Sequence, residues 1–230
     1  MTDDASLTRT AAANAVADIG WRYLLDTIVT TVAVPSLEQA VAVAAAAVEA
    51  CGADADGHLR VDVRPDRVEL SLQTRSGPAV TPRDPELAQR ITASLTERGC
   101  TTAVHTGEGR SVQSLEMAID AIDIAAIRPF WKAVLAYADE PGRGGPEDAV
   151  VDPVGQGPAI WFQQMDAPRP QRNRIHFDIT VAEDEADARV QAALAAGGVL
   201  VSDSEARSFW VLADIEGNEV CVCTWQDRDA

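Results

Sequence analysis

The sequence predicts an α+β protein of two domains, in which helices and strands follow one another in two different orders. In residues 1–100 the expected order is helix, two strands, helix, two strands, helix. In residues 114–230 a unit of strand, helix and further strands occurs twice, and internal repetition of this kind narrows the choice of fold. Residues 101–113 between them are small, polar and glycine-containing, as linkers are. We therefore place the domain boundary in this linker.

The elements of the first domain follow from hydrophobic spacing and from residues that start or stop helices. β-branched residues within 23–34 predict a strand. Ser36 is a suitable N-cap for a helix over 37–51, which Gly52 ends. The remaining expected elements are a first helix at 7–19, strands at 59–63 and 68–74 joined by a turn, and a helix at 85–98.

In the second domain each repeated unit begins with a strand that leads into a helix. The first unit has strands at 114–122 and 157–165 around a helix at 124–137. The second has a strand at 174–181, a helix at 184–196, and two or three strands that include the segment 210–223. This last segment places Glu219 and Cys221 on one strand, while His176 lies on another. Such a juxtaposition can form a cup-shaped metal or ligand site.

Composition excludes several classes of function. The formal net charge is −17, which repels phosphate backbones, so we expect no nucleic-acid partner. No apolar window is long enough to span a membrane, and the acidic N-terminus, Met1-Thr2-Asp3-Asp4, does not resemble a secretory signal, so we expect a cytoplasmic protein. The four cysteines form no CxxC pair and are expected to be free thiols; Cys221 and Cys223 face the same side of one strand as small buried residues.

Residues 5–98 resemble the pterin-4a-carbinolamine dehydratase family. The resemblance rests on Gly20-Trp21 before the first strand, the helix at 37–49, the strand end Leu72-Gln73-Thr74, and the helix start Thr81-Pro82-Arg83-Asp84-Pro85-Glu86-Leu87-Ala88. It implies a domain that dehydrates a hydroxypterin with histidines of a His-His-Pro turn and of a later Thr-His pair. Imidazoles serve as acid and base in such a reaction because they titrate near neutral pH.

This chain keeps only part of that histidine set. Gly57-His58-Leu59 stands where the family has His-His-Pro, and Thr74-Arg75 stands where it has Thr-His. The resemblance thus implies acid–base work for His58, with Arg75 holding an anionic substrate and Asp84 orienting a group at the substrate site. In the alternative interpretation His58 is a turn residue, and the domain keeps the fold without the chemistry.

Residues 114–226 resemble the vicinal oxygen chelate superfamily, the glyoxalase and bleomycin-resistance group. The motifs of its glyoxalase-like branch are Pro129-Phe130-Trp131, Asp152-Pro153 leading to Gly157-Pro158, Asn173-Arg174-Ile175-His176-Phe177-Asp178, and Ala213-Asp214-Ile215-Glu216-Gly217-Asn218-Glu219. The resemblance implies paired βαβββ modules that form an open cup. In metal-dependent members a divalent ion in the cup chelates two neighbouring substrate oxygens and stabilises an enolate or alkoxide.

Position by position, the resemblance assigns the metal ligands to Glu116, Gln163, His176 and Cys221, with Glu219 as an alternative to Cys221. The set is chemically mixed, because carboxylate and amide suit hard cations whereas thiolate suits zinc. A metal-free alternative makes His176 a hydrogen-bonding residue of a pocket wall, with Asp178 on the same strand face.

The tryptophans Trp131, Trp161 and Trp210 are candidates for the wall of an apolar cup that binds a flat organic ligand. Buried tryptophans of this kind also form hydrophobic cores. The sequence leaves both roles open for these three residues.

Four interpretations of function remain open. The first is a dehydratase, lyase or isomerase acting on a small molecule in the cup, with Glu116 and His176 as base and acid. The second is a 4a-hydroxytetrahydrobiopterin dehydratase that uses His58. The third is a non-catalytic small-molecule binding or resistance protein, and the fourth is a dimerisation module. Because the dehydratase-like family associates through its helices, we expect a homodimer; no cofactor other than a divalent metal is implied.

Overall fold

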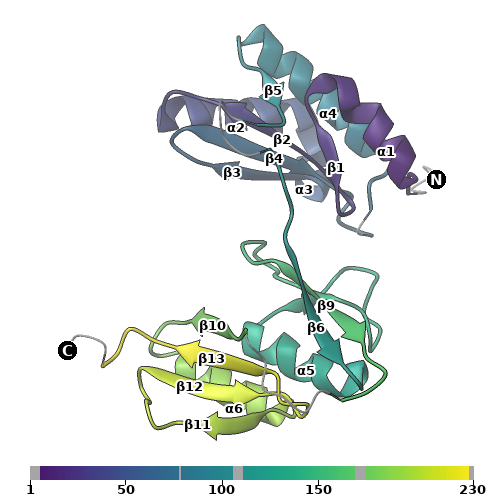
Figure 1. Ribbon diagram of the computed structural model, residues 1–230. Helices are drawn as coiled ribbons and strands as arrows, with labels where there is room; N and C mark the ends of the chain where they lie inside the picture. The colour runs from purple at the N-terminus through teal and green to yellow at the C-terminus, as the bar shows by residue number, and fades with distance from the viewer. Residues whose placement is uncertain (1–5, 78, 106–110, 169–174, 228–230) are drawn as a thin grey trace. The chain divides into compact units, whose positions relative to one another are not determined.

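The computed structural model describes residues 6–77, 79–105, 111–168 and 175–227 (Figure 1). The chain divides into two compact units, residues 1–114 and residues 115–230. Each unit combines helices with antiparallel or mixed sheets, so the α+β class predicted from the sequence is confirmed. Within the described residues, the helices are too short or too polar to cross a membrane.

The first unit is a twisted antiparallel sheet with helices on one face. Strand β2 (Thr27–Ala33) lies at its centre and pairs with β4 (Arg67–Leu72), which pairs in turn with β3 (Leu59–Val63). The other edge of β2 is shared by two short strands, β1 (Arg22–Leu24) and β5 (Thr102–Ala103). The helices are α1 (Arg9–Val16), η1 (Ala17–Ile19), α2 (Leu37–Cys51), η2 (Gly52–Asp54), α3 (Ala55–His58) and α4 (Arg83–Glu97).

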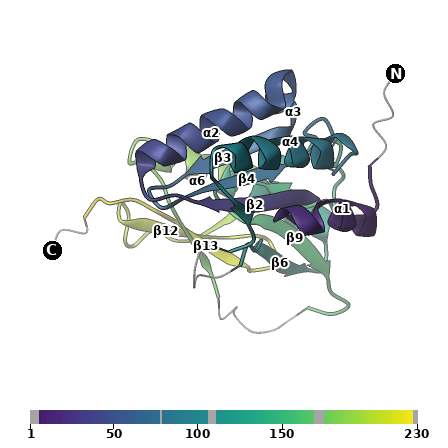
Figure 2. The ribbon, with the colours of Figure 1, turned by 90° about the horizontal axis from the view of Figure 1, so that it is seen from above.

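Helices α2 and α4 lie side by side across one face of this sheet (Figures 1 and 2). The alternation along β4 explains the packing, since Val68, Leu70 and Leu72 point inward and are at most 1% exposed. Trp21 is fully buried, and its indole nitrogen donates to Thr92 Oγ1 on α4 at 2.9 Å. The predicted order of helix, two strands, helix, two strands, helix is therefore present.

Two details of this unit differ from the sequence-based expectation. The expected strand 23–34 is a hairpin, because Leu25 and Asp26 adopt positive φ angles of 44° and 59° and turn the chain between β1 and β2. Part of the expected linker, residues 102–103, forms strand β5 and pairs with β2. The first unit therefore extends beyond residue 100.

The second unit consists of two βαβββ modules. The first contains β6 (Glu116–Ala121), α5 (Ile124–Leu135), β7 (Ala138–Asp139), β8 (Val150–Val151) and β9 (Ala159–Gln164). The second contains β10 (Phe177–Thr180), α6 (Ala186–Ala195), β11 (Val199–Ser202), β12 (Phe209–Ala213) and β13 (Glu219–Cys223). In each module the first strand pairs in parallel with the last, and within the described part of the unit neither sheet closes into a barrel. The repeated architecture predicted from the sequence is confirmed.

One hydrophobic core joins the two modules of the second unit. Buried residues of both modules belong to a single cluster, and the rings of Trp131 on α5 and Phe177 on β10 meet edge to face with centroids 5.6 Å apart. The indole nitrogen of Trp131 also donates to the carboxylate of Asp214 at 2.9 Å. The two modules therefore form one folded body.

An aspartate precedes the last strand of each module and organises the turn there. Asp152 accepts hydrogen bonds from the backbone amides of Val154, Gln156 and Gly157. In the second module Asp214 does the same for Glu216 and Asn218. Asp214 is buried, whereas Asp152 is half-buried. The sequence repeat is therefore a structural repeat at the level of individual hydrogen bonds.

Candidate functional site

The candidate site lies on the face of the β10–β13 sheet that points away from the core. Side chains alternate between the two faces of a strand. Phe177 and Ile179 of β10 pack against the hydrophobic core, so Asp178 between them points to the opposite face and is exposed. His176 lies directly before β10 and is also exposed, with 51% of its side chain accessible. Of the expected strand 174–181, residues 177–180 form β10 and His176 lies before it, while Arg174 is outside the described residues.

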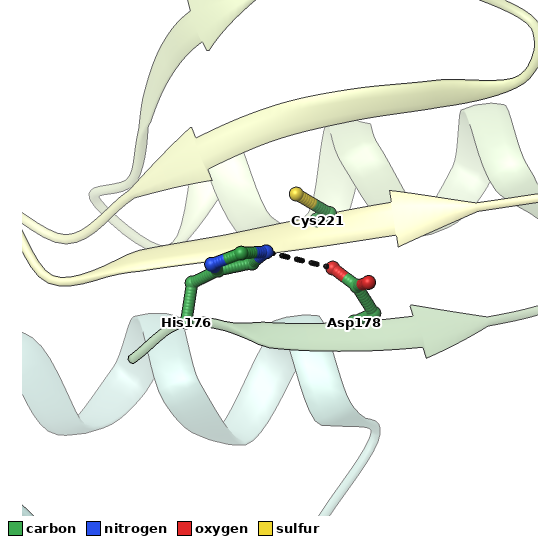
Figure 3. Close-up of side chains that lie close together, drawn as sticks. All are labelled: His176, Asp178 and Cys221. Carbon is green, nitrogen blue, oxygen red and sulfur yellow. Dashed lines mark ion pairs between the residues drawn. The ribbon is translucent and has the colours of Figure 1, made fainter. Parts of the chain in front are cut away.

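Parallel pairing of β10 with β13 brings a third chemical group to the same place. Asp178 lies opposite Cys221 in the register of the two strands. The imidazole of His176, the carboxylate of Asp178 and the sulfur of Cys221 lie within 4.8 Å of one another (Figure 3). The ion pair drawn in the figure joins His176 Nε2 to Asp178 Oδ1 at 3.4 Å. We call these three residues the His–Asp–Cys cluster.

The Cys221 thiol differs from the other two groups in its exposure. It is 9% exposed, because it lies between β10 on one side and β12 on the other, where its register partner is Val211. Burial raises the pKa of the Cys221 thiol to about 12, and its hydrogen bond with the Asp178 carboxylate acts in the same direction. In the absence of a cation the thiol therefore stays protonated, with the Asp178 carboxylate as its hydrogen-bonding partner.

The donor set of this cluster fits a divalent ion of the zinc type. Zinc is commonly bound by imidazole nitrogen, thiolate sulfur and carboxylate oxygen, and catalytic zinc sites use three protein ligands and leave the fourth position open. With bond lengths of about 2.0 Å to nitrogen and oxygen, two ligand atoms of a tetrahedral site lie about 3.3 Å apart. The distance between His176 Nε2 and Asp178 Oδ1, 3.4 Å, is close to that value.

The other two expected metal ligands lie on the sheet of the first module. Glu116 begins β6, and Gln163 lies on β9, opposite Asp120 in the parallel register. Both are exposed and, by alternation with the buried Ile119 and Phe162, point away from the core. Among the described histidine, cysteine, aspartate and glutamate side chains, the ligand atoms grouped around His176 are those of Asp178 and Cys221, so Glu116 is outside this group. Glu219 is half-buried on β13, two residues before Cys221, and is likewise outside that group.

The three tryptophans proposed for a ligand wall have different environments. Trp131 is 1% exposed and belongs to the core, where Phe130 and Phe177 contact its ring edge to face. Trp210 is half-buried and packs against the same core. Trp161 on β9 is 37% exposed and lies on the strand face that carries Gln163. Of the three, Trp161 has the most exposed side chain, and Trp131 is part of the hydrophobic core.

A second cluster of polar groups surrounds His58 in the first unit. His58 ends α3, and its Nδ1 atom lies 2.8 Å from Asp84 Oδ1 near the start of α4. Asp84 is fully buried, and its other oxygen accepts from the Thr81 amide at 2.7 Å and from Thr74 Oγ1 at 2.9 Å. His58 keeps 15% of its side chain exposed. The histidine is therefore held in one orientation with an edge open to solvent.

Arg75 and Asp84, expected to contact substrate, have different roles in this arrangement. Arg75 is exposed, and its backbone amide donates to the Gly57 carbonyl at 3.0 Å, so the backbone at Arg75 runs beside the His58 turn. One guanidinium nitrogen donates to the carbonyl of Leu59 at 3.2 Å. Asp84 is closed off from solvent and contacts His58 instead. The Asp84 carboxylate therefore faces the imidazole and not the solvent, whereas the Arg75 side chain is exposed.

Asp178 was not among the expected ligands, although the sequence contained a signal for it. It lies two residues after His176, so alternation alone puts both side chains on one strand face. What the sequence does not specify is the register that sets Asp178 opposite Cys221, 43 positions later in the chain.

Comparisons with known proteins address both units. Residues 116–223 match the family model described as a glyoxalase-like domain, and residues 5–94 match the family model of pterin 4 alpha carbinolamine dehydratase. A search among curated proteins gave no match.

Solved structures resemble each unit separately. A glyoxalase/bleomycin resistance protein/dioxygenase family enzyme from Burkholderia phytofirmans PsJN is 19% identical, with a TM-score of 0.39 over 47% of this chain and 95% of the other. A transcriptional coactivator/pterin dehydratase from Brucella melitensis is 22% identical, with a TM-score of 0.35 over 39% of this chain and 98% of the other. From the two family matches, the chain contains a pterin dehydratase-like domain followed by a glyoxalase-like domain.

Proposed function

We propose that the glyoxalase-like domain is an enzyme of the lyase or isomerase type that acts on a small organic molecule beside the His–Asp–Cys cluster. The observation that supports this most directly is the convergence of an imidazole, a carboxylate and a thiol within 4.8 Å on the non-core face of a sheet. Exposed histidine and aspartate side chains contribute little to folding, so their proximity to a buried thiol is better explained by binding.

A divalent ion held by His176, Asp178 and Cys221 would supply Lewis-acid polarisation of a substrate oxygen and stabilise the negative charge that forms on it. The chain's own residues do the remaining work. Trp161 offers an exposed ring surface to an apolar part of the substrate. Glu116 is an exposed carboxylate on the non-core face of β6, and we assign it the role of general base that takes a proton from the carbon next to the polarised oxygen.

Oxalate, which presents two neighbouring oxygens, tests this function without knowledge of the natural substrate. We expect calorimetric titration of the full chain, loaded with a divalent metal ion, to show one oxalate site. The His176→Ala variant should lose it, whereas Glu116→Gln should retain it, because a general base acts on the proton and not on the chelating oxygens. Oxalate binding that is absent from the metal-loaded protein, or unchanged in His176→Ala, contradicts the proposal.

A second function is favoured by the pairing of His58 with Asp84 in the dehydratase-like domain. A buried carboxylate 2.8 Å from an imidazole nitrogen fixes the ring and leaves its other nitrogen for proton transfer. We propose dehydration of a 4a-hydroxypterin at this position, with Arg75 near the substrate. The full chain should accelerate loss of water from a 4a-hydroxytetrahydropterin above the buffer rate, and His58→Ala should abolish the acceleration. A rate equal to that of buffer alone rules this activity out.

A further inference from the structure

We infer that the glyoxalase-like domain holds zinc through its second module alone, with His176, Asp178 and Cys221 as ligands and with Glu116 and Gln163 outside the coordination sphere. This inference rests on the proposed function for the location of the site and adds the identity of the ion and of its ligands. It departs from the set expected by resemblance, which draws ligands from both modules.

The geometry places all three ligand atoms on two adjacent strands. Neighbouring paired strands lie about 4.8 Å apart, and Asp178 and Cys221 are direct register partners on β10 and β13. His176, two residues before Asp178, completes the group from the same face. An ion can therefore be bound here without any contribution from β6 or β9, which carry Glu116 and Gln163.

The chemistry of the three groups selects among divalent ions. Magnesium and calcium prefer oxygen ligands throughout, whereas thiolate and imidazole favour zinc. The Cys221 sulfur lies between the Asp178 and Val211 positions of neighbouring strands and is 9% exposed, so most of its surface is withdrawn from water. Since His176 and Asp178 are exposed, the fourth position of a tetrahedral ion faces solvent and can accept a substrate oxygen.

Cobalt substitution reports on the sulfur ligand directly. Cobalt(II) bound to a thiolate absorbs in the near ultraviolet through sulfur-to-metal charge transfer, whereas cobalt(II) bound only by nitrogen and oxygen does not. We expect this absorption when Co²⁺ is added to the full chain, and we expect zinc to displace it with a stoichiometry of one ion per chain. The Cys221→Ser variant should lose the band.

Cys223→Ser is the matched control, because Cys223 also lies on β13, faces the same side and is buried. It should keep the band, and the comparison separates loss of a ligand from damage to the strand. His176→Ala and Asp178→Asn should weaken zinc binding more than about 100-fold, since loss of a group that only supports a ligand already costs about 10- to 100-fold. Glu116→Gln and Gln163→Ala should leave zinc affinity within about twofold of the unchanged chain, well below that effect.

Three results overturn the inference. The first is a charge-transfer band that survives Cys221→Ser, and the second is a band that vanishes equally in Cys223→Ser. The third is a Glu116→Gln variant whose zinc affinity falls as far as that of His176→Ala. Failure of the proposed function has a different signature: zinc binds as described, but oxalate does not bind to the zinc-loaded chain.

Discussion

Replacing Asp214 by alanine should destabilise the glyoxalase-like domain by about 3–5 kcal/mol, since each buried donor left without its partner costs about 1–3 kcal/mol. The Asp214 carboxylate is 2% exposed and accepts four hydrogen bonds of 2.8 to 2.9 Å. The donors are the Trp131 indole, the Asn218 side-chain amide and the backbone amides of Glu216 and Asn218. The Trp131 indole is almost fully buried and cannot turn to water, whereas the turn amides can be partly resolvated.

Asp152→Ala is the internal control for this prediction, because Asp152 occupies the corresponding turn of the first module. It is half-buried and holds backbone amides of an exposed loop, so its loss should cost only about 1 kcal/mol.

The assay is urea unfolding of the full chain followed by tryptophan fluorescence. Four of the five tryptophans (Trp131, Trp161, Trp210 and Trp225) lie in the second unit, so the signal is dominated by that unit. If Asp214→Ala loses no more stability than Asp152→Ala, the argument from the buried indole is wrong.

Three further predictions concern the dehydratase-like domain. Gly20→Ala should lower the free energy of unfolding by more than about 2 kcal/mol, because Gly20 has a φ of 77° and an added methyl group would collide with the backbone carbonyl of Thr102. Gly99 has a similar φ of 73° but lies in open space, so Gly99→Ala should lose less stability in thermal unfolding. Burial raises the pKa of the Cys51 thiol to about 11, so above pH ~9 the unfolded chain loses this proton while the folded chain keeps it. Relative to Cys51→Ala, the unchanged chain should therefore lose on the order of 3 kcal/mol of unfolding free energy as pH rises to about 11. Parallel pH profiles of the two proteins would contradict this. Asp84→Ala should lower the melting temperature more than His58→Ala, because it strands buried donors whereas His58 is partly exposed; an equal loss would argue against Asp84 as the organising group.

Much of the secondary structure could be predicted because local signals coincide with the ends of elements. The helix predicted at 37–51 matches α2 because the Ser36 hydroxyl caps its first turn and Gly52 ends it. The turn at Leu25 and Asp26 was missed because neither residue is the glycine or asparagine that usually marks a hairpin. Strand β5 was missed because two residues carry no periodicity, and only pairing with β2 makes them a strand.

The sites depend on contacts that are remote in sequence, and here prediction from the sequence was less complete. His58 and Asp84 are 26 residues apart in the sequence, and only the folded chain brings the end of α3 within hydrogen-bonding distance of the start of α4. The sequence pointed to His176 and Cys221, and the structure brings their side chains together. Alternation puts Asp178 on the same face as His176, but the register that sets it opposite Cys221 could not be predicted from the sequence. The general-base role of Glu116, like the expected homodimer, stays a prediction.

X-ray absorption spectroscopy of the zinc-loaded full chain tests the central claim most directly, since it counts sulfur ligands without reference to any substrate. The His–Asp–Cys cluster predicts one sulfur at about 2.3 Å and the remaining ligands as nitrogen or oxygen at about 2.0–2.1 Å. A zinc environment without sulfur would contradict the claim that Cys221 is a ligand. So would an environment with two sulfurs, because Cys223 would then have to bind the ion as well.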